Sequence, residues 1–386
     1  MLKKILLVLL IVGLGFGIYF YFDNSKVEEV PKETKKEVVE LTDSDVEKSM
    51  FKKYYKKAIE VVDKMTTEEK VGQIFLVRYS YSDTEYFNNF NPGGYILFAR
   101  DFENHTKDSM KEELEEVNNR GKYPLILGVD EEGGFVTRIS RFPEFRSEKF
   151  KAPKDYYLEG GYDLVEQTEN EKAKLLKSLG LNLNLAPVAD VSTNENDFIY
   201  SRAFGKGAVE TSEYISKMVT YANNNKINSC LKHFPGYGNN VDTHTGIAID
   251  ERDYESFKNN DFLPFEAGIK ENVPSILISH NIVKCMDENY PASLSKNVIK
   301  ELRETLNFTG IIITDDLAMD AVKSYVENGK AATLALNAGN DMIITSDFVT
   351  MYKEVLQSIE SKEVSIDTLN KAVIRIIAWK YYSGIM

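Results

Sequence analysis

Eight short apolar runs, each about as long as one β-strand, recur along the chain and are separated by longer stretches with helical periodicity. This alternation is typical of a parallel α/β fold, in which a helix connects each strand to the next. Eight such units favour a closed (β/α)8 barrel, the TIM barrel, over an open doubly wound sheet. The predicted strands are Gln73–Arg78, Gly94–Ala99, Leu125–Asp130, Leu181–Ala186, Ser229–His233, Ser275–His280, Gly310–Thr314 and Asp341–Thr345.

Both ends of the predicted barrel domain carry helix signals. Thr66 and Glu69 have the spacing of a capping box, in which each side chain accepts a hydrogen bond from the other residue's backbone N–H, so a helix is predicted to begin there. Apolar residues such as Leu369 and Val373 keep helical spacing towards the C-terminus. Little room remains for a second domain, and we assign residues 51–386 to one TIM-barrel domain.

The N-terminus has the composition of a membrane segment. Lys3 and Lys4 precede an uncharged apolar run over residues 5–22, which at about 1.5 Å per residue nearly spans a hydrocarbon core of about 30 Å. We predict that residues 1–22 are an uncleaved membrane anchor, because the run lacks an Ala-x-Ala cleavage site, although a cleaved signal sequence stays open. Residues 23–50 would be a polar tether. The lysines place the barrel outside the cell membrane, or in secreted form if the segment is cleaved.

Composition narrows the classes of partner and cofactor. The formal net charge of −13 argues against nucleic acid, whose phosphates need a basic surface. A neutral or weakly charged small substrate fits better, and we expect no cofactor, no metal ion and a monomeric chain. Cys230 and Cys285 are too few for a disulfide framework. Both are predicted to be core residues, and a bridge between them stays open.

Charged and polar residues follow several of the predicted strands at the point where each strand ends. In a TIM barrel these ends meet at one mouth, where barrel enzymes place their chemistry. Such groups are costly to bury one by one, so a shared substrate pocket explains them better than chance does. The residues concerned are Asp130, Glu131, Glu132, Asp190, Lys232, His233, His280, Asp315 and Asp316.

Asp315 is the strongest candidate for a catalytic carboxylate. It leaves an Ile-rich strand, which should hold its backbone rigid at the barrel mouth. Cleavage of a glycosidic bond needs such a carboxylate near the anomeric carbon and a proton donor for the leaving oxygen. Asp316 alternates to the other side and is expected to be structural, for example as a helix cap. Taken alone, the two residues could equally be a pair of capping groups.

A glycine-rich loop from Lys232 to His244 supplies the second group. Asp242 and His244 lie two positions apart on it, so Asp242 can orient His244 and raise its basicity. His244 would then act as the acid and base. An exposed histidine beside a chance aspartate is the ordinary alternative. However, three of the chain's four histidines fall at strand ends or in the loops beyond them, which favours the catalytic interpretation.

Six stretches of this sequence carry a resemblance to a known family. From about Thr66 onward, the chain resembles the single-barrel β-N-acetylhexosaminidases of glycoside hydrolase family 3, which remove terminal N-acetylglucosamine from cell-wall fragments. Any one stretch is a weak signal, but all six occur in the order of the family. They are Gly93–Arg100, Asp130–Gly134 with Arg138, Ala186–Val191, Ser201–Gly205, Lys232–Gly236 and Thr314–Met319.

The resemblance implies roles for individual residues. It makes Asp315 the nucleophile that forms a covalent glycosyl intermediate, and Asp242 with His244 the acid–base dyad on a mobile loop. From the residues alone, Arg202 could instead pair with Asp190. The resemblance also implies a set of ligands for the sugar hydroxyls, binding through charge-assisted hydrogen bonds. These ligands are Asp130, Arg138, Arg202, Lys232 and His233, although Lys232 could equally serve to anchor Asp130.

The chain departs from the family pattern near the dyad. Tyr237 stands where the family usually has His, and the stretch between Gly238 and Asp242 is one residue shorter than in the family. A shorter loop could displace His244 enough to slow proton transfer. Phe135 also replaces a common Arg after the Gly-Gly pair, which could alter specificity or only local packing.

The leading hypothesis is hydrolysis of terminal β-linked N-acetylglucosamine with retention of configuration. Phosphorolysis stays open, because a histidine acid–base carries no negative charge that would repel phosphate. The short loop also keeps open a membrane-tethered sugar-binding protein without catalysis. A metallohydrolase with ligands among His233, His244, His280 and Asp315 is disfavoured, because the chain lacks a closely spaced His-x-His pair on an early strand.

Overall fold

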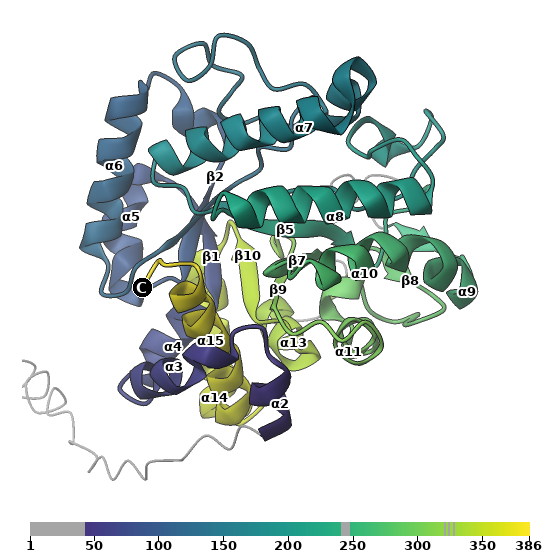
Figure 1. The fold of residues 1–386 in the computed structure, drawn as a ribbon. Helices are drawn as coiled ribbons and strands as arrows, with labels where there is room; N and C mark the ends of the chain where they lie inside the picture. The colour runs from purple at the N-terminus through teal and green to yellow at the C-terminus, as the bar shows by residue number, and fades with distance from the viewer. Residues whose placement is uncertain (1–42, 241–247, 320–321, 323–324, 327–328) are drawn as a thin grey trace, which may run out of the picture. The chain divides into compact units, whose positions relative to one another are not determined.

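The computed structural model describes residues 43–240, 248–319, 322, 325–326 and 329–386. Within them, eight parallel strands form a closed barrel in the order β1, β10, β9, β7, β5, β4, β3, β2 (Figure 1). Each strand overlaps one of the predicted runs, so the predicted TIM barrel is confirmed. The strands are β1 (Phe75–Arg78), β2 (Gly94–Leu97), β3 (Ile126–Val129), β4 (Leu183–Asn184), β5 (Asn228–Phe234), β7 (Ser275–Ile278), β9 (Ile311–Thr314) and β10 (Met342–Thr345).

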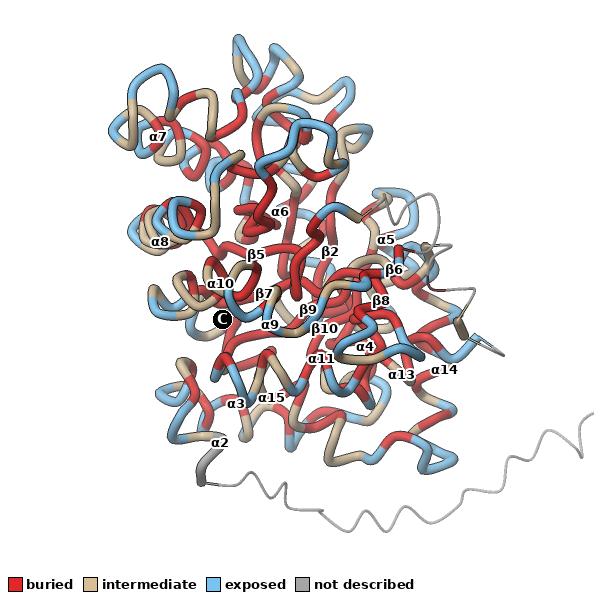
Figure 2. Tube along the Cα trace, turned by 90° about the vertical axis from the view of Figure 1, so that its right-hand side faces the viewer, coloured by how far each residue is buried: buried red, intermediate tan, exposed pale blue. Residues whose placement is uncertain are grey.

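The barrel strands are buried on both faces. β3 and β9 are buried along their whole length, which is expected of parallel strands covered by helices. β1 closes the ring by pairing with β10, where Phe75 lies opposite Ile343. Figure 2 shows the buried strands enclosed by helices with exposed outer faces. These helices include α5 (Tyr81–Phe87), α6 (Lys107–Arg120), α7 (Pro153–Ser178), α8 (Ala208–Asn224), α10 (Phe262–Lys270), α11 (Lys296–Lys300), α13 (Ala331–Ala338) and α14 (Phe348–Glu360).

The predicted capping box is present at the start of α4 (Thr67–Gln73). Thr66 Oγ1 accepts a hydrogen bond from Glu69 N at 3.3 Å, and Glu69 Oε2 accepts one from Thr66 N at 3.1 Å. Two short strands were not predicted: β6 (Ile249–Asp250) and β8 (Ile282–Val283) pair in parallel outside the barrel. Runs of this length are too short for a period to show in a sequence.

The described chain begins with helices that precede the capping box. α2 (Asp43–Lys48) and α3 (Tyr55–Val62) come first, and between them Phe51 is buried with its ring 5.2 Å from that of Tyr382. The predicted anchor, residues 1–22, lies outside the described residues, and no helix within them is both long and apolar enough to cross a membrane.

Both cysteines are free thiols. Cys230 is buried in β5, as predicted. Cys285 is exposed, so its prediction as a core residue is wrong. It follows the two-residue strand β8 next to the exposed Lys284, where the chain leaves the core.

Helix α15 (Ile366–Tyr382) closes the end of the barrel opposite the mouth. Its apolar residues are buried, as their spacing predicted. Near its C-terminus, Trp379 Nε1 donates to Asn228 Oδ1 at 2.9 Å, and Lys380 Nζ donates to Gln73 Oε1 at 2.8 Å. Asn228 begins β5 and Gln73 directly precedes β1, so α15 contacts the N-terminal ends of strands on two sides of the ring.

Lys380 is a fully buried lysine, and burial lowers its pKa to about 7. In the unfolded chain a lysine has a pKa of about 10.4. Between these two values the unfolded chain binds more protons than the folded protein, so the contribution of Lys380 to stability grows as pH rises and shrinks as pH falls towards 7.

We therefore expect Lys380→Met to change the pH dependence of stability. From about pH 10 to about pH 7, the free energy of unfolding of the wild type should fall relative to that of the variant, since only the wild type has an amine that the unfolded chain protonates and the folded protein keeps neutral. Urea unfolding at several pH values measures this difference. Lys353→Met removes an exposed lysine from α14 and is the matched control. A difference for Lys380→Met that does not vary with pH would contradict the expectation.

Candidate active site

The polar residues predicted at strand ends lie at one end of the barrel. Asp130 directly follows β3, Lys232 and His233 belong to the last part of β5, and Asp315 directly follows β9. All these strands run in parallel, so their C-terminal ends form one mouth. The structure therefore brings these predicted residues to the same end of the barrel.

Lys232 is the centre of a buried group of charges. Its Nζ lies 2.7 Å from Asp130 Oδ1 and 2.6 Å from Glu132 Oε1, and its side chain is only 3% exposed. Burial by itself lowers the pKa of Lys232, but the two carboxylates outweigh it and raise that pKa above its usual value. The ammonium group therefore stays charged. Its contact with Asp130 is the anchoring interaction that the sequence left open as an alternative role for Lys232.

Arg202 forms a two-pronged ion pair with Glu132. Arg202 Nε and Nη2 donate to the two carboxylate oxygens at 3.0 and 2.7 Å. Burial raises the pKa of Glu132, but Arg202 and Lys232 lower it by more, so the carboxylate is ionised. Arg202 therefore pairs with Glu132. The sequence alone had left open a pair with Asp190 instead, and the structure does not form it.

Asp190 orients His233 instead. Asp190 Oδ2 lies 2.8 Å from His233 Nδ1, and Oδ1 accepts a hydrogen bond from Tyr237 N at 2.7 Å. On the other side of the ring, His233 Nε2 lies 3.2 Å from Arg202 Nη2. A guanidinium nitrogen can only donate, so Nε2 accepts and Nδ1 carries the proton that is donated to Asp190. Tyr237 is buried, with its ring edge-on to His233 at 5.5 Å.

The loop after β3 is held by a second buried carboxylate, Glu131. Its Oε2 accepts hydrogen bonds from the backbone N–H groups of Arg138 and Ile139 at 2.7 and 2.8 Å. This fixes Arg138, whose Nη2 lies 3.7 Å from Asp130 Oδ2. The sequence placed Glu131 and Glu132 among the residues at the mouth but gave neither an individual role. One signal in the sequence could have identified them. Two further acids follow Asp130 at a strand end, and the buried cations at the same mouth need carboxylate partners.

Asp315 and Asp316 have different surroundings. Asp315 is half-buried, and its Oδ1 accepts a hydrogen bond from Asp316 N at 2.8 Å. Asp316 Oδ1 accepts hydrogen bonds from Ala318 N at 2.9 Å and from Ser346 N at 3.1 Å, so it joins the loops after β9 and β10. The expectation that Asp316 is structural agrees with these contacts.

Asp242 and His244, the predicted acid–base dyad, lie outside the described residues. The chain on either side of them is firmly attached. Asn240 Nδ2 donates to Asp250 Oδ2 at 2.6 Å, and Arg252 Nη2 pairs with the same oxygen at 2.7 Å. The two ends of the loop are therefore joined through one buried aspartate.

His280, another strand-end residue, is buried and occupied by protein contacts. Its Nδ1 lies 2.8 Å from Ser293 Oγ, and its Nε2 lies 3.1 Å from the backbone oxygen of Asp316. Among the described residues, no group of three His, Cys, Asp or Glu side chains could hold a metal ion. His244, one of the ligands in the metallohydrolase alternative, lies outside that part of the chain.

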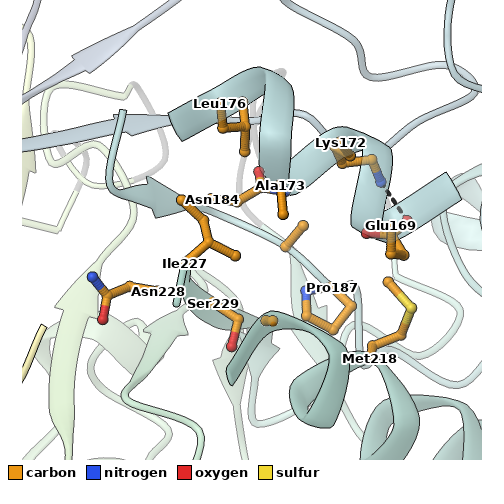
Figure 3. A pocket seen from close by; sticks show the side chains of 12 residues that line it. Glu169, Lys172, Ala173, Leu176, Asn184, Pro187, Met218, Ile227, Asn228 and Ser229 are labelled. Carbon is orange, nitrogen blue, oxygen red and sulfur yellow. Dashed lines mark hydrogen bonds and ion pairs between the residues drawn. The ribbon is translucent and has the colours of Figure 1, made fainter. Parts of the chain in front are cut away.

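Figure 3 shows a small cavity between α7, α8 and the strands, lined by Met218, Ile227 and Pro187 among others. Its volume of about 30 Å³ has room for water only. Lys172 pairs with Glu169 beside it and also donates to the backbone oxygen of Glu132 at 3.2 Å. The cavity is thus no sugar site, but its wall supports the loop that carries Glu132.

Such a mouth suits a substrate rich in hydroxyl groups, because ionised side chains with fixed positions make directional, charge-assisted hydrogen bonds to them. The fold and site together define a sugar-handling barrel enzyme. The chain belongs to glycosyl hydrolase family 3: the model described as "Glycosyl hydrolase family 3 N terminal domain" matches residues 66–379. The predicted resemblance is confirmed, and the protein is a glycoside hydrolase.

Several known proteins are similar to this chain. A β-hexosaminidase of Nitrosomonas eutropha is 30% identical over 282 residues, which cover 72% of this chain and 80% of that protein. Among solved structures, a family 3 β-N-acetylglucosaminidase from Paenibacillus sp. has a TM-score of 0.77 at 24% identity, covering 83% of this chain and 63% of that one. A β-N-acetylhexosaminidase from Beutenbergia cavernae has a TM-score of 0.71 at 23% identity, covering 83% and 99%. The structural matches show the same fold.

Removing the charge of Glu132 should destabilise the whole site. In Glu132→Gln, Lys232 and Arg202 lose their shared carboxylate while they remain buried, and an uncompensated buried charge costs about 3–5 kcal/mol. Urea unfolding should show a loss of that size in the free energy of unfolding. Glu144→Gln, at an exposed position of the same loop, should change it by less than about 0.5 kcal/mol. A loss below about 1 kcal/mol for Glu132→Gln would contradict this account.

Proposed function

We propose that this chain is a retaining exo-β-N-acetylglucosaminidase, that is, a β-N-acetylhexosaminidase that hydrolyses terminal β-linked N-acetylglucosamine, with fragments of cell-wall peptidoglycan as its substrates. The β-hexosaminidases among its relatives support the choice of sugar. The observation that carries the proposal is the position of Asp315, which follows β9 at the same end of the barrel as the Lys232 charge group.

In the proposed mechanism, Asp315 attacks the anomeric carbon and forms a covalent bond to it through a carboxylate oxygen. His244, oriented by Asp242, donates a proton to the leaving oxygen as the glycosidic bond breaks. Water then gives its proton to His244 and attacks the same carbon, which releases the sugar and restores the Asp315 carboxylate. Two displacements at one carbon retain its configuration.

The terminal sugar is bound on the side of the mouth formed by β3 to β5. Asp130 and Arg138 keep 14% and 26% of their side chains exposed, so they can reach the sugar hydroxyls directly. Lys232 is almost fully buried and contributes mainly by holding Asp130. Glu132 and Asp190 hold Arg202 and His233 in place before the sugar arrives, which reduces the entropy lost on binding.

We also propose that residues 1–22 anchor the enzyme in the cell membrane, with the barrel outside. The support comes from the sequence: two lysines followed by an uncharged apolar run. In fractionated cells, the protein should stay with membranes after a high-salt wash and be accessible to added protease in intact spheroplasts. Recovery of a shortened chain in the medium would show a cleaved signal sequence instead.

The two catalytic roles should be separable by their dependence on the leaving group. With p-nitrophenyl N-acetyl-β-glucosaminide, Asp315→Asn should lose at least about a thousandfold in kcat/KM, because no nucleophile remains. His244→Ala should lose less, and its loss should be larger for a substrate with a poor leaving group, such as an unactivated disaccharide, because only that oxygen needs a proton.

Asp108→Asn, at an exposed position in the first turn of α6, is the control and should retain full activity. Full activity in Asp315→Asn would refute the mechanism. Sugar binding by the wild type without turnover at any pH would instead identify a sugar-binding protein. Formation of N-acetylglucosamine 1-phosphate when phosphate is added would identify a phosphorylase.

A further inference from the structure

Three arginines gather around the ends of β1, β2 and β3, and one of them, Arg138, also borders the sugar-binding side of the mouth, where its Nη2 lies 3.7 Å from Asp130 Oδ2. Arg78 is the last residue of β1, Arg100 lies in the short helix η3 (Ala99–Phe102) after β2, and Arg138 lies in the loop after β3. The ring of Phe98 holds two of them: the guanidinium carbons of Arg78 and Arg138 lie 4.5 and 5.4 Å from its centre. We call Arg78, Arg100 and Arg138 the arginine cluster.

The arginine cluster differs from the ion pairs elsewhere in the described chain. Within the described residues, no guanidinium of the cluster has a carboxylate oxygen closer than 3.7 Å, and Arg78 has none within the 4.0 Å limit of an ion pair. The other arginines that form ion pairs have a carboxylate oxygen within 3.0 Å. They are Arg120, Arg146, Arg202, Arg252, Arg303 and Arg375.

The carboxylates near the cluster are engaged elsewhere. Asp130, 3.7 Å from Arg138, pairs with Lys232 at 2.7 Å. Asp101 Oδ2 accepts a hydrogen bond from Phe98 N at 2.7 Å, and Asp316 accepts two backbone N–H groups. The Nε atoms of Arg78 and Arg138 are buried and donate to no described group. Burial and the charge of Arg100 lower the pKa of Arg78, and Asp101 and Asp316 offset this only in part. The cluster thus combines two half-buried arginines, Arg78 and Arg138, with the exposed Arg100, and its positive charge exceeds the negative charge around it.

A terminal N-acetylglucosamine unit is uncharged and gives no reason for this surplus. The opposite side of the mouth is different, because Lys232 and Arg202 are matched there by Asp130 and Glu132. A planar guanidinium fixed against an aromatic ring can bind two oxygens of one anion. Several guanidinium groups close together bind such an anion more strongly.

We propose that the arginine cluster is a binding subsite for an oxyanion that lies beyond the bond being cleaved. This inference rests on the proposed function, because it places the anion relative to a sugar bound next to Asp315. Two sources share the chemistry. One is a carboxylate on the leaving part of the substrate. The other is inorganic phosphate, one of whose oxygens would attack the anomeric carbon of the glycosyl–Asp315 intermediate, forming a sugar 1-phosphate and releasing the Asp315 carboxylate.

The test compares two β-N-acetylglucosaminides that differ only in charge: one whose aglycone carries a carboxylate, and its methyl ester. Arg78→Gln and, separately, Arg100→Gln should lower kcat/KM for the carboxylate substrate by about tenfold or more beyond any change for the ester. Arg141→Gln removes an exposed arginine from the loop after β3 and is the matched control, with no preference between the substrates. Arg100 is exposed, so its variant should fold even if Arg78→Gln does not.

A second assay tests phosphate as the anion. It uses the methyl ester substrate with added phosphate and measures the formation of sugar 1-phosphate. If phosphate is the anion, the concentration for half-maximal product should rise about tenfold in both cluster variants. The inference would be overturned if the cluster variants lost equal kcat/KM on both substrates and the phosphate concentration for half-maximal product did not change. The proposed glycosidase function would still stand in that case. If the wild type cleaves neither glycoside, the proposed function fails. Calorimetric titration with the carboxylate glycoside and with phosphate then decides: the cluster is an oxyanion site only if Arg100→Gln weakens the binding of one of them.

Discussion

The site depends on one buried ammonium group. Lys232 Nζ is shared between Asp130 and Glu132, and Glu132 is shared in turn with Arg202. These residues come from the loop after β3, from the segment before α8 and from β5, so three separate parts of the chain meet at one charge. A lone charge at this depth would be very unfavourable, and each partner is therefore tolerable only with the others in place. Rigidity at the mouth follows from this mutual dependence.

The mouth has two electrostatic halves. On the side of β3 to β5, positive and negative groups are matched, and the ring of His233 is fixed between Asp190 and Arg202. On the side of β1 and β2, guanidinium groups exceed carboxylates. The matched half suits an uncharged sugar, and the unmatched half suits whatever is attached to it. Selectivity for the sugar and selectivity for its attachment therefore depend on different residues, except for Arg138, which borders both halves.

The sequence predicted the barrel because its strands are buried on both faces and so read as continuous apolar runs. It also predicted which residues meet at the mouth, since the ends of parallel strands must coincide. It did not predict which charged residues form ion pairs with one another. Arg202 is 70 positions from Glu132 and far closer along the chain to Asp190, and only the path of the loop after β3 decides between them. The exposure of Cys285 was likewise missed, because a two-residue strand leaves no periodic signal.

Helix α15 has a consequence for how the protein is made. Trp379 and Lys380 supply contacts to Asn228 and Gln73 at the floor of the barrel, yet they are synthesised after all eight strands. While a ribosome is still adding residues 366–382, the strand ends at that floor lack their cover, and apolar surface stays open to other chains. The barrel can therefore acquire its complete floor only after its last helix has emerged.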